Sequence, residues 1–333
     1  MSVSEVNKIK KVKIGFIADD IRNLNEFGVF HNTTFGLMLA AQELNTKVLF
    51  TESNNLKIIN NKVFAKFDEI RVKQKINEHF KVIDNAEYSL DSLNIIFARK
   101  DPPINESYLS YIQMLSLVPP KTLIVNNPNG ILKSNEKLYV FNFPQIIPPT
   151  LVTSYKTQAF DFLKRYKEAV IKPLFNKGGE GVFYLNIESE NAEANSIIEK
   201  SIDKEHTVII QKYLPEVISG DKRIILLNGE PLGGIIRIPK KGEFRAHISR
   251  GADFKELILS KKDLAICEML KPYLLRDGLY FVAIDLIGDY LIEVNFTCPS
   301  NLLEVGQCNS NSKSKNLAKD IVLWAIGAIE KIK

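Results

Sequence analysis

The chain has 333 residues, of which 45% are apolar and 25% are charged, and its formal net charge is +5. This ordinary mix excludes a disordered chain, and the length favours two or three packed lobes over one small domain. The small excess of Lys and Arg favours anionic ligands weakly and argues against nucleic-acid binding, which normally needs a concentrated basic face.

The cysteines and the N-terminal residues indicate the cellular compartment in which the protein is expected. Cys267, Cys298 and Cys308 cannot all pair within one chain and lack the CxxC spacing of a zinc site. We therefore expect a reduced, cytoplasmic setting. The N-terminus shows no apolar signal core, and no stretch approaches the roughly 20 apolar residues of a membrane-spanning helix. The expectation is an unprocessed protein with no membrane partner.

The first part of the chain predicts an α/β lobe. The apolar run VKIGFIA, within Lys11 to Ala18, is typical of a buried strand. Thr33-Thr34 can cap a helix, which is followed by the strand KVLFT and by a hairpin turned at Asn60-Asn61. The strands LNIIFARK and TLIVN, with a helix near Tyr108 to Leu117 between them, complete an open sheet. This lobe is expected to close near Asn126.

The middle of the chain predicts a small α+β unit. After the connection NNPNG, a short helix is expected to begin at Ser134-Asn135 and to run through Lys137 to Phe141. A helix from Thr157 to Tyr166, the strands AVIKPL, VFYLN and TVIIQKYL, and a helix from Ala192 to Ser201 follow. Two of these strands flank the glycine loop NKGGEG, as in a lid-like module.

The last third predicts two hairpins and two helices. RIILLNGEPLGGIIRIP turns at Asn228-Gly229, and LYFVAIDLIGDYLIEVNF turns at Gly288-Asp289. Between them lie the polar stretch KKGEFRAHISRGADF and a helix from Lys261 to Leu275. A closing helix is expected from about Ser314 to Ile332.

Three polar residues interrupt the second of these hairpins. Asp285 lies in its first strand, and Glu293 and Asn295 lie two apart in the next strand, so all three can converge on one face. Oxygen ligands in this arrangement suit Mg²⁺, which keeps waters and shares phosphates. The alternative is an ordinary solvent-facing strand, although acidic residues are poor strand formers.

Two lysines and a glycine loop suggest a phosphate site. Lys172 lies within the apolar strand AVIKPL, where a cation is costly unless it meets an anion. Lys137 in NEKL, taken alone, is better explained as a solvated helix lysine. Gly178 and Gly179 let backbone N–H groups approach phosphates, although such a loop is as often structural. The chain has neither GxxxxGK nor a strand-linked GxGxxG, which argues against P-loop and dinucleotide-binding folds.

Charged residues, most of them basic, crowd the region that follows this unit. Arginine gives bidentate, permanently charged contacts to carboxylates and phosphates. Arg223 and Arg237 end apolar strands, which favours a pocket, whereas Arg245 and Arg250 are equally explained by a solvated loop. The residues concerned are Asp221, Lys222, Arg223, Arg237, Arg245 and Arg250.

A series of short motifs occurs along the chain in the following order: RKDPP, IVNNP, NEKL, PTLVT, IKPL, GGEGV, QKYLP, GDKR, NGEP, IRIP, IDLIGD and EVNFT. This order resembles that of the prokaryotic glutathione synthetases of the ATP-grasp superfamily. The resemblance extends from Lys13 to about Glu304. It implies an ATP-grasp fold of mixed α/β and α+β class, with a pre-ATP-grasp α/β domain (1–126), a central lid domain (127–212) and a C-terminal domain with the metal site (213–333). It also implies a homo-oligomer, a tetramer in this family.

The resemblance also assigns roles. It implies that ATP and Mg²⁺, with Mn²⁺ possible, join γ-glutamylcysteine to glycine through an acyl phosphate. Arg223, Arg237 and Arg245 would act on the reacting groups, and Asp285, Glu293 and Asn295 would bind the metal. Arg99 and the helix start at Thr33 would lie near the dipeptide site. ATP would contact Lys137, Lys172, Gly178, Gly179, Gln211, Lys212, Tyr213, Leu214, Asp221 and Lys222.

The sequence departs from the family pattern in one loop. The family usually has Arg-Gly-Asn followed by two glycines, whereas this chain has Arg245-Ala246-His247 and then Gly251-Ala252. A second hypothesis therefore keeps the ligase chemistry and changes the peptide or amino-acid pair. A nucleotide-binding subunit without catalysis would lack the metal and phosphate residues, which are present here, and a dinucleotide-dependent oxidoreductase would need the missing glycine fingerprint.

Overall fold

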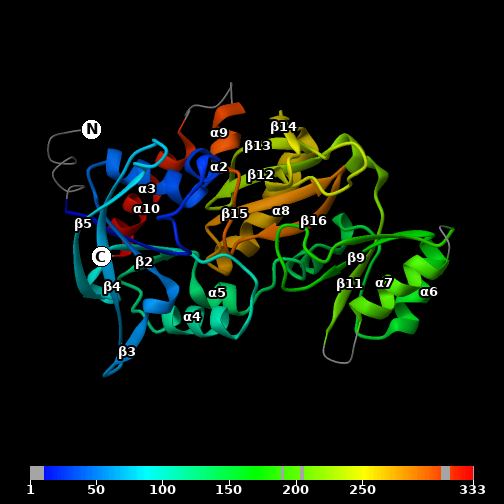
Figure 1. Cartoon of the computed structure of the whole chain (residues 1–333), viewed down its shortest axis with the longest axis horizontal. Coiled ribbons are helices and arrows are strands. Elements are labelled where there is room, and N and C mark those ends of the chain that lie inside the picture. Colours follow the sequence, from blue (N-terminus) through cyan, green and yellow to red (C-terminus); the bar gives the residue numbers. More distant parts are fainter. Residues whose placement is uncertain (1–10, 189–190, 203–205, 309–315, 333) are drawn as a thin grey trace.

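The computed structural model describes residues 11–188, 191–202, 206–308 and 316–332. Within these ranges the strands form three sheets, which lie one after another along the longest axis of the molecule (Figure 1). None of the helices in this part of the chain combines the length and the apolar character needed to cross a bilayer.

The first sheet forms the centre of the predicted α/β lobe. Its strands are, in spatial order, β3 (Lys57–Ile59), β4 (Lys62–Val72), β2 (Lys47–Glu52), β1 (Lys13–Ala18), β6 (Ile95–Arg99) and β7 (Leu123–Val125), and β5 (Phe80–Ser89) pairs with β4. The strands β2, β1, β6 and β7 run parallel, as the alternation of strands and helices predicts. The accompanying helices are α2 (Glu26–His31), α3 (Thr33–Glu43) and α4 (Glu106–Ser116). The carboxyl ends of β1 and β6 lie next to one of the cavities described below.

The second sheet is the lid-like unit. It has the order β10 (Phe183–Asn186), β9 (Glu168–Pro173), β11 (Val208–Lys212) and β8 (Thr150–Thr153), all antiparallel. The helices α6 (Lys156–Tyr166) and α7 (Asn191–Ser201) pack with this sheet around a separate small core that includes Leu163, Ile171 and Ile198. Because this core is separate, the unit forms a distinct lobe at one end of the molecule (Figure 1).

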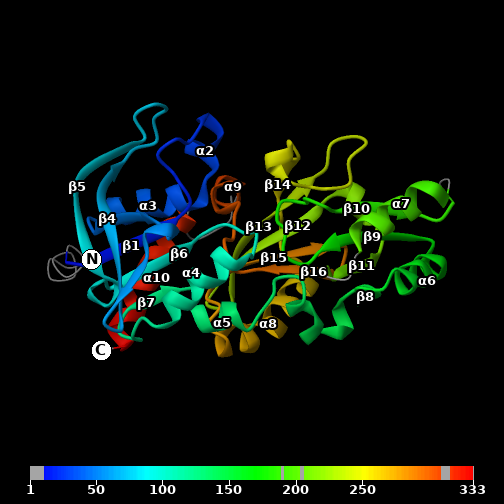
Figure 2. The same ribbon diagram turned by 60° about the horizontal axis from the view of Figure 1, so that its bottom comes forward.

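The third sheet lies between the other two. Its antiparallel order is β14 (Asp253–Glu256), β13 (Glu230–Ile238), β12 (Asp221–Leu227), β15 (Phe281–Ile287) and β16 (Tyr290–Asn295). Figure 2 shows α8 (Lys261–Arg276) running along one side of this sheet, and α9 (Leu302–Cys308) follows β16. Asn228 and Gly229 both have positive φ, at 53° and 78°, so the predicted turn between β12 and β13 is confirmed.

The final helix connects the end of the chain to its beginning. The helix α10 (Leu317–Ile332) packs against α3, and Ile321, Val322 and Ala325 belong to the same buried core as the first sheet. This one core therefore contains residues from both the first (1–126) and the third (213–333) of the domains expected from the sequence. The helix start expected at Ser314 lies outside the described residues.

Several local predictions were wrong or incomplete. The connection NNPNG contains a helix, α5 (Pro128–Leu132), because Pro128 occupies its first position and the Asn127 side chain caps it. The expected helix through Lys137 is instead a turn that leads into a 3₁₀ segment, Tyr139–Asn142. The strands β5, β8 and β14 were not predicted. Of these, β5 is mostly exposed and lacks apolar alternation.

Candidate active site

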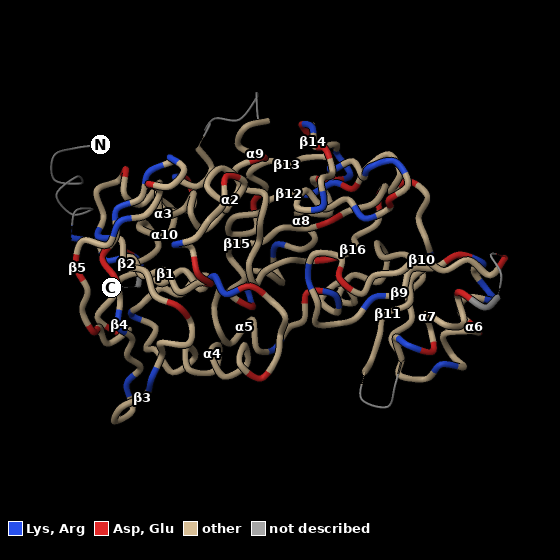
Figure 3. The backbone as a smooth tube through the Cα atoms, in the orientation of Figure 1, with Lys and Arg blue, Asp and Glu red and all other residues tan. Residues whose placement is uncertain are grey.

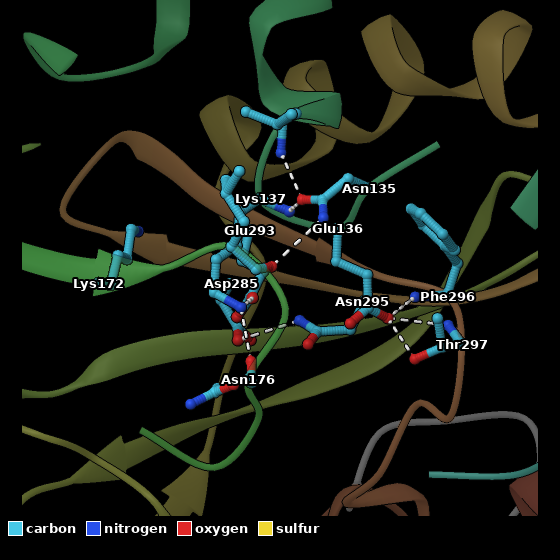
Figure 4. A network of polar contacts seen from close by, with 12 residues as sticks. Asn135, Glu136, Lys137, Lys172, Asn176, Asp285, Glu293, Asn295, Phe296 and Thr297 are labelled. Atoms are coloured by element: carbon cyan, nitrogen blue, oxygen red, sulfur yellow. Dashed lines mark hydrogen bonds and ion pairs between the residues drawn. The ribbon is translucent and has the colours of Figure 1, made fainter. Parts of the chain in front are cut away.

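The hairpin β15–β16 brings the three predicted metal ligands together. Asp285 pairs with Glu293, and Ala283 pairs with Asn295, so Glu293 and Asn295 point to the same face of the ribbon. Asn295 Nδ2 donates to Asp285 Oδ2 at 3.2 Å, and Asp285 is only 5% exposed. Figure 4 shows these side chains grouped beside Lys137. The predicted convergence is confirmed.

Two arginines from neighbouring strands hold the Asp285 carboxylate. Arg223 donates from Nε and Nη2 to its two oxygens at 2.8 and 2.7 Å, and Arg237 Nη2 lies 3.2 Å from Oδ2. Arg237 also makes a bidentate contact with Asp221, at 2.8 and 2.5 Å. Burial alone would raise the pKa of Asp285, but the guanidinium groups of Arg223 and Arg237 hold that pKa well below its usual range. The group is therefore an ionised carboxylate.

Two buried lysines lie near these carboxylates. Lys172 on β9 is 7% exposed, and its Nζ donates to Gln211 Oε1 at 3.2 Å. Burial lowers the pKa of Lys172 to about 8, against the opposing attraction of Glu293. Lys137 Nζ donates to the Asn176 carbonyl at 2.7 Å and lies 3.3 Å from Glu293 Oε1. Lys137 is therefore held next to the Glu293 carboxylate, and Lys172 is close enough for that charge to act on its pKa.

The buried Glu136 positions Lys137, a role that the sequence analysis did not predict. Its Oε1 accepts hydrogen bonds from the backbone N–H groups of Phe296 and Thr297 at 2.7 and 2.8 Å, and from Thr297 Oγ1 at 2.8 Å (Figure 4). Burial raises the pKa of Glu136. The bonds fasten the turn that carries Lys137 to the end of β16. The acidic residue inside the motif NEKL was the available signal.

The glycine loop and the polar stretch after β13 cover the site together. Gly178 and Gly179 adopt positive φ, at 62° and 70°, and their carbonyls face arginines of that stretch. Arg250 Nε donates to the Gly178 carbonyl at 2.8 Å, and Arg245 Nη1 donates to the Gly179 carbonyl at 3.3 Å. A Cβ atom on Gly179 would lie 3.0 Å from the His247 ring. The two segments are in direct contact.

His247 belongs to the same polar stretch and lines the site. Burial lowers the pKa of His247 to about 4, and the positive charges of Arg237 and Arg223 act in the same direction. The imidazole is therefore neutral at neutral pH, and it can donate or accept a hydrogen bond without adding charge.

These groups line one cavity of about 700 Å³ between the second and third sheets. Of the predicted site residues, the structure brings together Lys137, Lys172, Gly178, Gly179, Gln211, Lys212, Tyr213, Leu214, Asp221, Arg223, Arg237, Arg245, Asp285, Glu293 and Asn295.

Lys222 is the predicted site residue that does not line this cavity. Its Nζ donates to Asp263 Oδ1 at 2.7 Å, near the start of α8. Neighbours in a strand point to opposite faces, so Asp221 and Arg223 on one face place Lys222 on the other. The structure gives Lys222 a contact with α8 in place of the predicted contact with ATP.

A second cavity of about 270 Å³ adjoins the first. It extends towards β1, α2 and α3 of the first sheet and ends beside His31 and Glu304. The residues that line both cavities are Asp101, Arg223, Arg237, His247, Ser249, Cys298 and Ser300.

Comparison with protein families gives two matches that together span most of the chain. Residues 12–131 match the N-terminal domain of prokaryotic glutathione synthetase, and residues 136–310 match its ATP-grasp domain. The chain belongs to the prokaryotic glutathione synthetase family. The resemblance noted in the sequence is confirmed, and the fold that it implied is the ATP-grasp fold.

Individual relatives agree with this family assignment. The chain is 36% identical to the glutathione synthetase of Synechocystis sp. over 324 residues, which cover 94% of this chain and 98% of that protein. It is 37% identical to the glutathione synthetase of Coxiella burnetii over 297 residues, covering 88% and 91%.

Solved structures of similar fold are distant in sequence. A D-cycloserine synthetase superposes with a TM-score of 0.66 at 15% identity, covering 96% of this chain and 100% of that one. An ATP-grasp ligase of Chryseobacterium gregarium gives a TM-score of 0.63 at 14% identity, covering 95% and 97%. At these identities the likeness concerns the fold alone.

Proposed function

We propose that the chain joins γ-glutamylcysteine to glycine, with ATP converted to ADP and phosphate, to form glutathione. The observation that carries this proposal is the convergence of Lys137, Lys172, Arg223 and Arg237 on the carboxylates of β15–β16 within one cavity, in a chain of this family. Such a site concentrates positive charge next to oxygen ligands, which is what transfer of a phosphoryl group requires.

ATP would lie across the cavity from the lid sheet to the third sheet. Gln211 and Lys212 end β11, Tyr213 and Leu214 come directly after it, and all four would line the adenine side. Lys172 and Lys137 would face the phosphates. Gly178 and Gly179 would cover the phosphates from above. The cost of burying the charged Lys172 side chain is offset once the triphosphate supplies a negative charge beside it.

The residues fit a magnesium ion. Among the described residues, no three His, Cys, Asp or Glu side chains are gathered as a metal cage. The site instead offers the carboxylates of Asp285 and Glu293 and the amide oxygen of Asn295, and such a small set of oxygen ligands suits an ion that shares phosphates and keeps waters. Mg²⁺ would hold these three residues together and neutralise charge on the phosphates, and Mn²⁺ would serve similarly.

The remaining steps follow from the charged groups of this chain. The cysteinyl carboxylate of the dipeptide attacks the γ-phosphorus, the O–P bond to ADP breaks, and an acyl phosphate forms. Arg223 and Arg237 stabilise the charge on the transferred group, and Arg245 fastens the cover that excludes water. The neutral glycine amine then attacks the carbonyl carbon, and phosphate leaves. Cys298, whose thiol pKa burial raises well above its usual value, is not needed as a nucleophile.

The test is ADP release with Mg-ATP and γ-glutamylcysteine, with and without glycine. We expect strong glycine-dependent release, lost by about 100-fold or more in Lys172→Ala because a phosphate contact is removed. Lys164→Ala is the matched control, since that lysine lies on the lid helix α6 with its side chain 70% exposed. No release with both substrates present would contradict the proposal.

A second candidate keeps the chemistry and changes the substrates. His247 occupies the position where the family usually has asparagine, and it lines both cavities. A panel of acceptor amines, monitored by phosphate release, separates the two candidates. Turnover with an amine other than glycine, at a higher kcat/KM, would favour this one.

We also propose a cellular location and an oligomeric state for the protein. The three cysteines form no disulfide in the described residues, which fits a reducing cytoplasm. The family resemblance suggests a homotetramer. Light scattering coupled to size-exclusion chromatography would measure the mass against the 37.7 kDa of one chain.

A further inference from the structure

Two loops from different sheets meet beside the larger cavity. One follows β6 of the first sheet and contains Asp101 and Ile104, and the other follows β9 of the lid sheet and contains Phe175 and Lys177. The Ile104 N–H donates to the Phe175 carbonyl at 3.3 Å, and Lys177 Nζ forms an ion pair with Asp101 Oδ2. Asp101 and Lys177 both line the 700 Å³ cavity. The lid is thus attached to the first sheet by two contacts at this place.

The backbone of Asp101 is held by the first sheet. Its N–H donates to Asp19 Oδ2 at 2.9 Å, and Asp19 directly follows β1. Asp101 itself comes two residues after the end of β6, and β6 pairs with β1. Two adjacent strands therefore set where the Asp101 carboxylate begins, and this carboxylate meets Lys177 from a supported position.

The lid side of the contact directly precedes the glycine loop. Lys177 is followed by Gly178 and Gly179, which both have positive φ, and a Cβ atom on Gly178 would have no atom within 4 Å. Glycine loses more conformational freedom on ordering than any other residue. Fixing Lys177 at one end of this loop therefore reduces the entropy that is lost when the loop becomes ordered over a ligand.

We propose that Asp101 is a positioning residue, which holds the glycine loop in place for the nucleotide through its ion pair with Lys177. The affinity for Mg-ATP then depends on a residue of the first sheet, although the nucleotide lies between the other two sheets. This inference rests on the proposed function, which places the nucleotide there.

The same contact links the two cavities. Asp101 lines both of them, whereas Lys177 lines the larger cavity and not the second one. A ligand that restrains Asp101 from the second cavity therefore strengthens nucleotide binding through Lys177. Because such coupling is reciprocal, the nucleotide strengthens binding of that ligand by the same factor.

Charge reversal tests the ion pair by calorimetric binding of Mg-AMPPNP, an ATP analogue that resists hydrolysis. Asp101→Lys and Lys177→Asp should each raise its dissociation constant by about fivefold, because like charges then face each other. The double variant exchanges the two charges and should return to within about twofold of the wild-type value. High salt should reduce the loss in both single variants, because it screens exposed charges.

The direction of the change separates positioning from a general effect of charge on the phosphates. Asp101→Lys adds positive charge beside the cavity, and by attraction alone it would tighten Mg-AMPPNP binding. Positioning predicts weaker binding. The matched control is the ion pair Lys156–Glu199 within the lid, whose side chains are 38% and 54% exposed, compared with 46% and 44% for Lys177 and Asp101. Reversing either charge of the control pair should change the dissociation constant by less than about twofold.

Kinetics and a second ligand give independent readouts. In Asp101→Lys, the KM for ATP in glycine-dependent ADP release should rise by about fivefold, while kcat at saturating ATP changes by less than about twofold. Saturating γ-glutamylcysteine should tighten Mg-AMPPNP binding by about fivefold in the wild-type protein and by less than about twofold in Lys177→Ala. Thermal melting confirms that each variant is folded.

The outcomes separate this role from the overall function. Unchanged dissociation constants in both single reversals, tighter binding in Asp101→Lys, or a double variant as weak as the single ones would overturn the positioning role. Equal tightening by γ-glutamylcysteine in the wild-type protein and in Lys177→Ala would overturn the link between the cavities. If γ-glutamylcysteine and glycine together give no ADP, the proposed function fails. Binding of Mg-AMPPNP alone still decides the role of Asp101 in that case.

Discussion

Lys172 is the residue on which the electrostatics of the site depend most. It is a buried cation whose pKa lies near 8, so its charge is partly lost in mildly alkaline solution. The groups around it are Gln211, which accepts its hydrogen bond, and the opposing charges of Lys137 and Glu293. An arriving triphosphate would stabilise the charged form and raise the pKa of Lys172 again.

The affinity for Mg-ATP should therefore fall as the pH rises above about 8, because the deprotonated lysine no longer attracts the phosphates. Calorimetry from pH 7 to 9.5 measures the dissociation constant and the protons taken up on binding. Lys172→Arg keeps its charge throughout this range, so its affinity should stay level. A wild-type affinity that is constant to pH 9.5 would contradict this explanation.

His247 predicts a pH dependence of stability. Its pKa is about 4 in the folded protein and 6.5 ordinarily, so between these values the unfolded state binds more protons. The free energy of unfolding should therefore decrease as the pH falls from 6.5 to 4, by up to about 3 kcal/mol from this residue. Urea unfolding of the wild-type protein and of His247→Asn measures the difference. Parallel pH profiles for the two proteins would exclude this role.

At the residue scale, the sequence predicted the ligands that depend on local spacing. Glu293 and Asn295 lie two apart in a strand, so their shared face followed from the pleat. Lys222 was placed in the site with its neighbours, although strand alternation turns it towards α8. Glu136 was missed because its partners lie about 160 residues away in the chain, and no local pattern encodes that contact.

At the element scale, the glycine loop after β9 and the stretch after β13 form one cover. Their contacts run from arginine side chains to glycine carbonyls, so the backbone conformation of the loop sets where the arginines lie. Residues of both segments line the 700 Å³ cavity, so we expect the two segments to separate when ATP enters. Closure of such covers excludes water from reactive intermediates.

Gly179→Ala should disturb this cover. The residue has φ of 70°, and its new Cβ would lie 3.0 Å from His247 and 3.1 Å from Arg245. We expect kcat/KM for ATP to fall about 10- to 100-fold. Gly242→Ala is the control, because that glycine also has positive φ, at 85°, but open space around it. Equal losses in both variants would indicate backbone strain alone.

Hairpins were the elements that the sequence predicted best. Asn60 and Asn61, like Asn228 and Gly229, have the positive φ that their residue types allow, and so the turns fixed the strand pairing. The strand β5 escaped prediction because it lies at the edge of the sheet with most of its side chains exposed, so it lacks the apolar alternation of a half-buried strand. Figure 3 shows basic and acidic residues interspersed along the backbone, and charged residues within a strand weaken its apolar alternation.

At the scale of the whole molecule, the site depends on how the three sheets fit together. Asn126, at the end of the first sheet, donates to the carbonyls of Phe281 and Phe296 at 2.7 Å and accepts from the Phe281 N–H at 2.7 Å. Phe281 begins β15 and Phe296 directly follows β16, so these bonds attach the first sheet to the hairpin β15–β16. The family resemblance predicted three lobes, but it could not predict such contacts between residues far apart in the chain.

Gly130→Ala should loosen the contact between α5 and the end of α8. A Cβ atom there would lie 1.9 Å from the Asp277 carbonyl at the end of α8, so the two helices must move apart. We expect the free energy of unfolding to fall by about 2 kcal/mol or more. Gly327→Ala in α10 has open space and should stabilise the protein slightly. Denaturant unfolding of both variants measures this, and an unchanged Gly130→Ala protein would contradict the packing.

The central claim is that the donor carboxylate attacks ATP, and isotope transfer tests it most directly. The cysteinyl carboxylate of γ-glutamylcysteine is labelled with ¹⁸O, and the protein is supplied with Mg-ATP and glycine. An acyl phosphate passes one labelled oxygen to the phosphate that leaves, so the account predicts one ¹⁸O atom in each phosphate released. Glutathione formed together with unlabelled phosphate would contradict it.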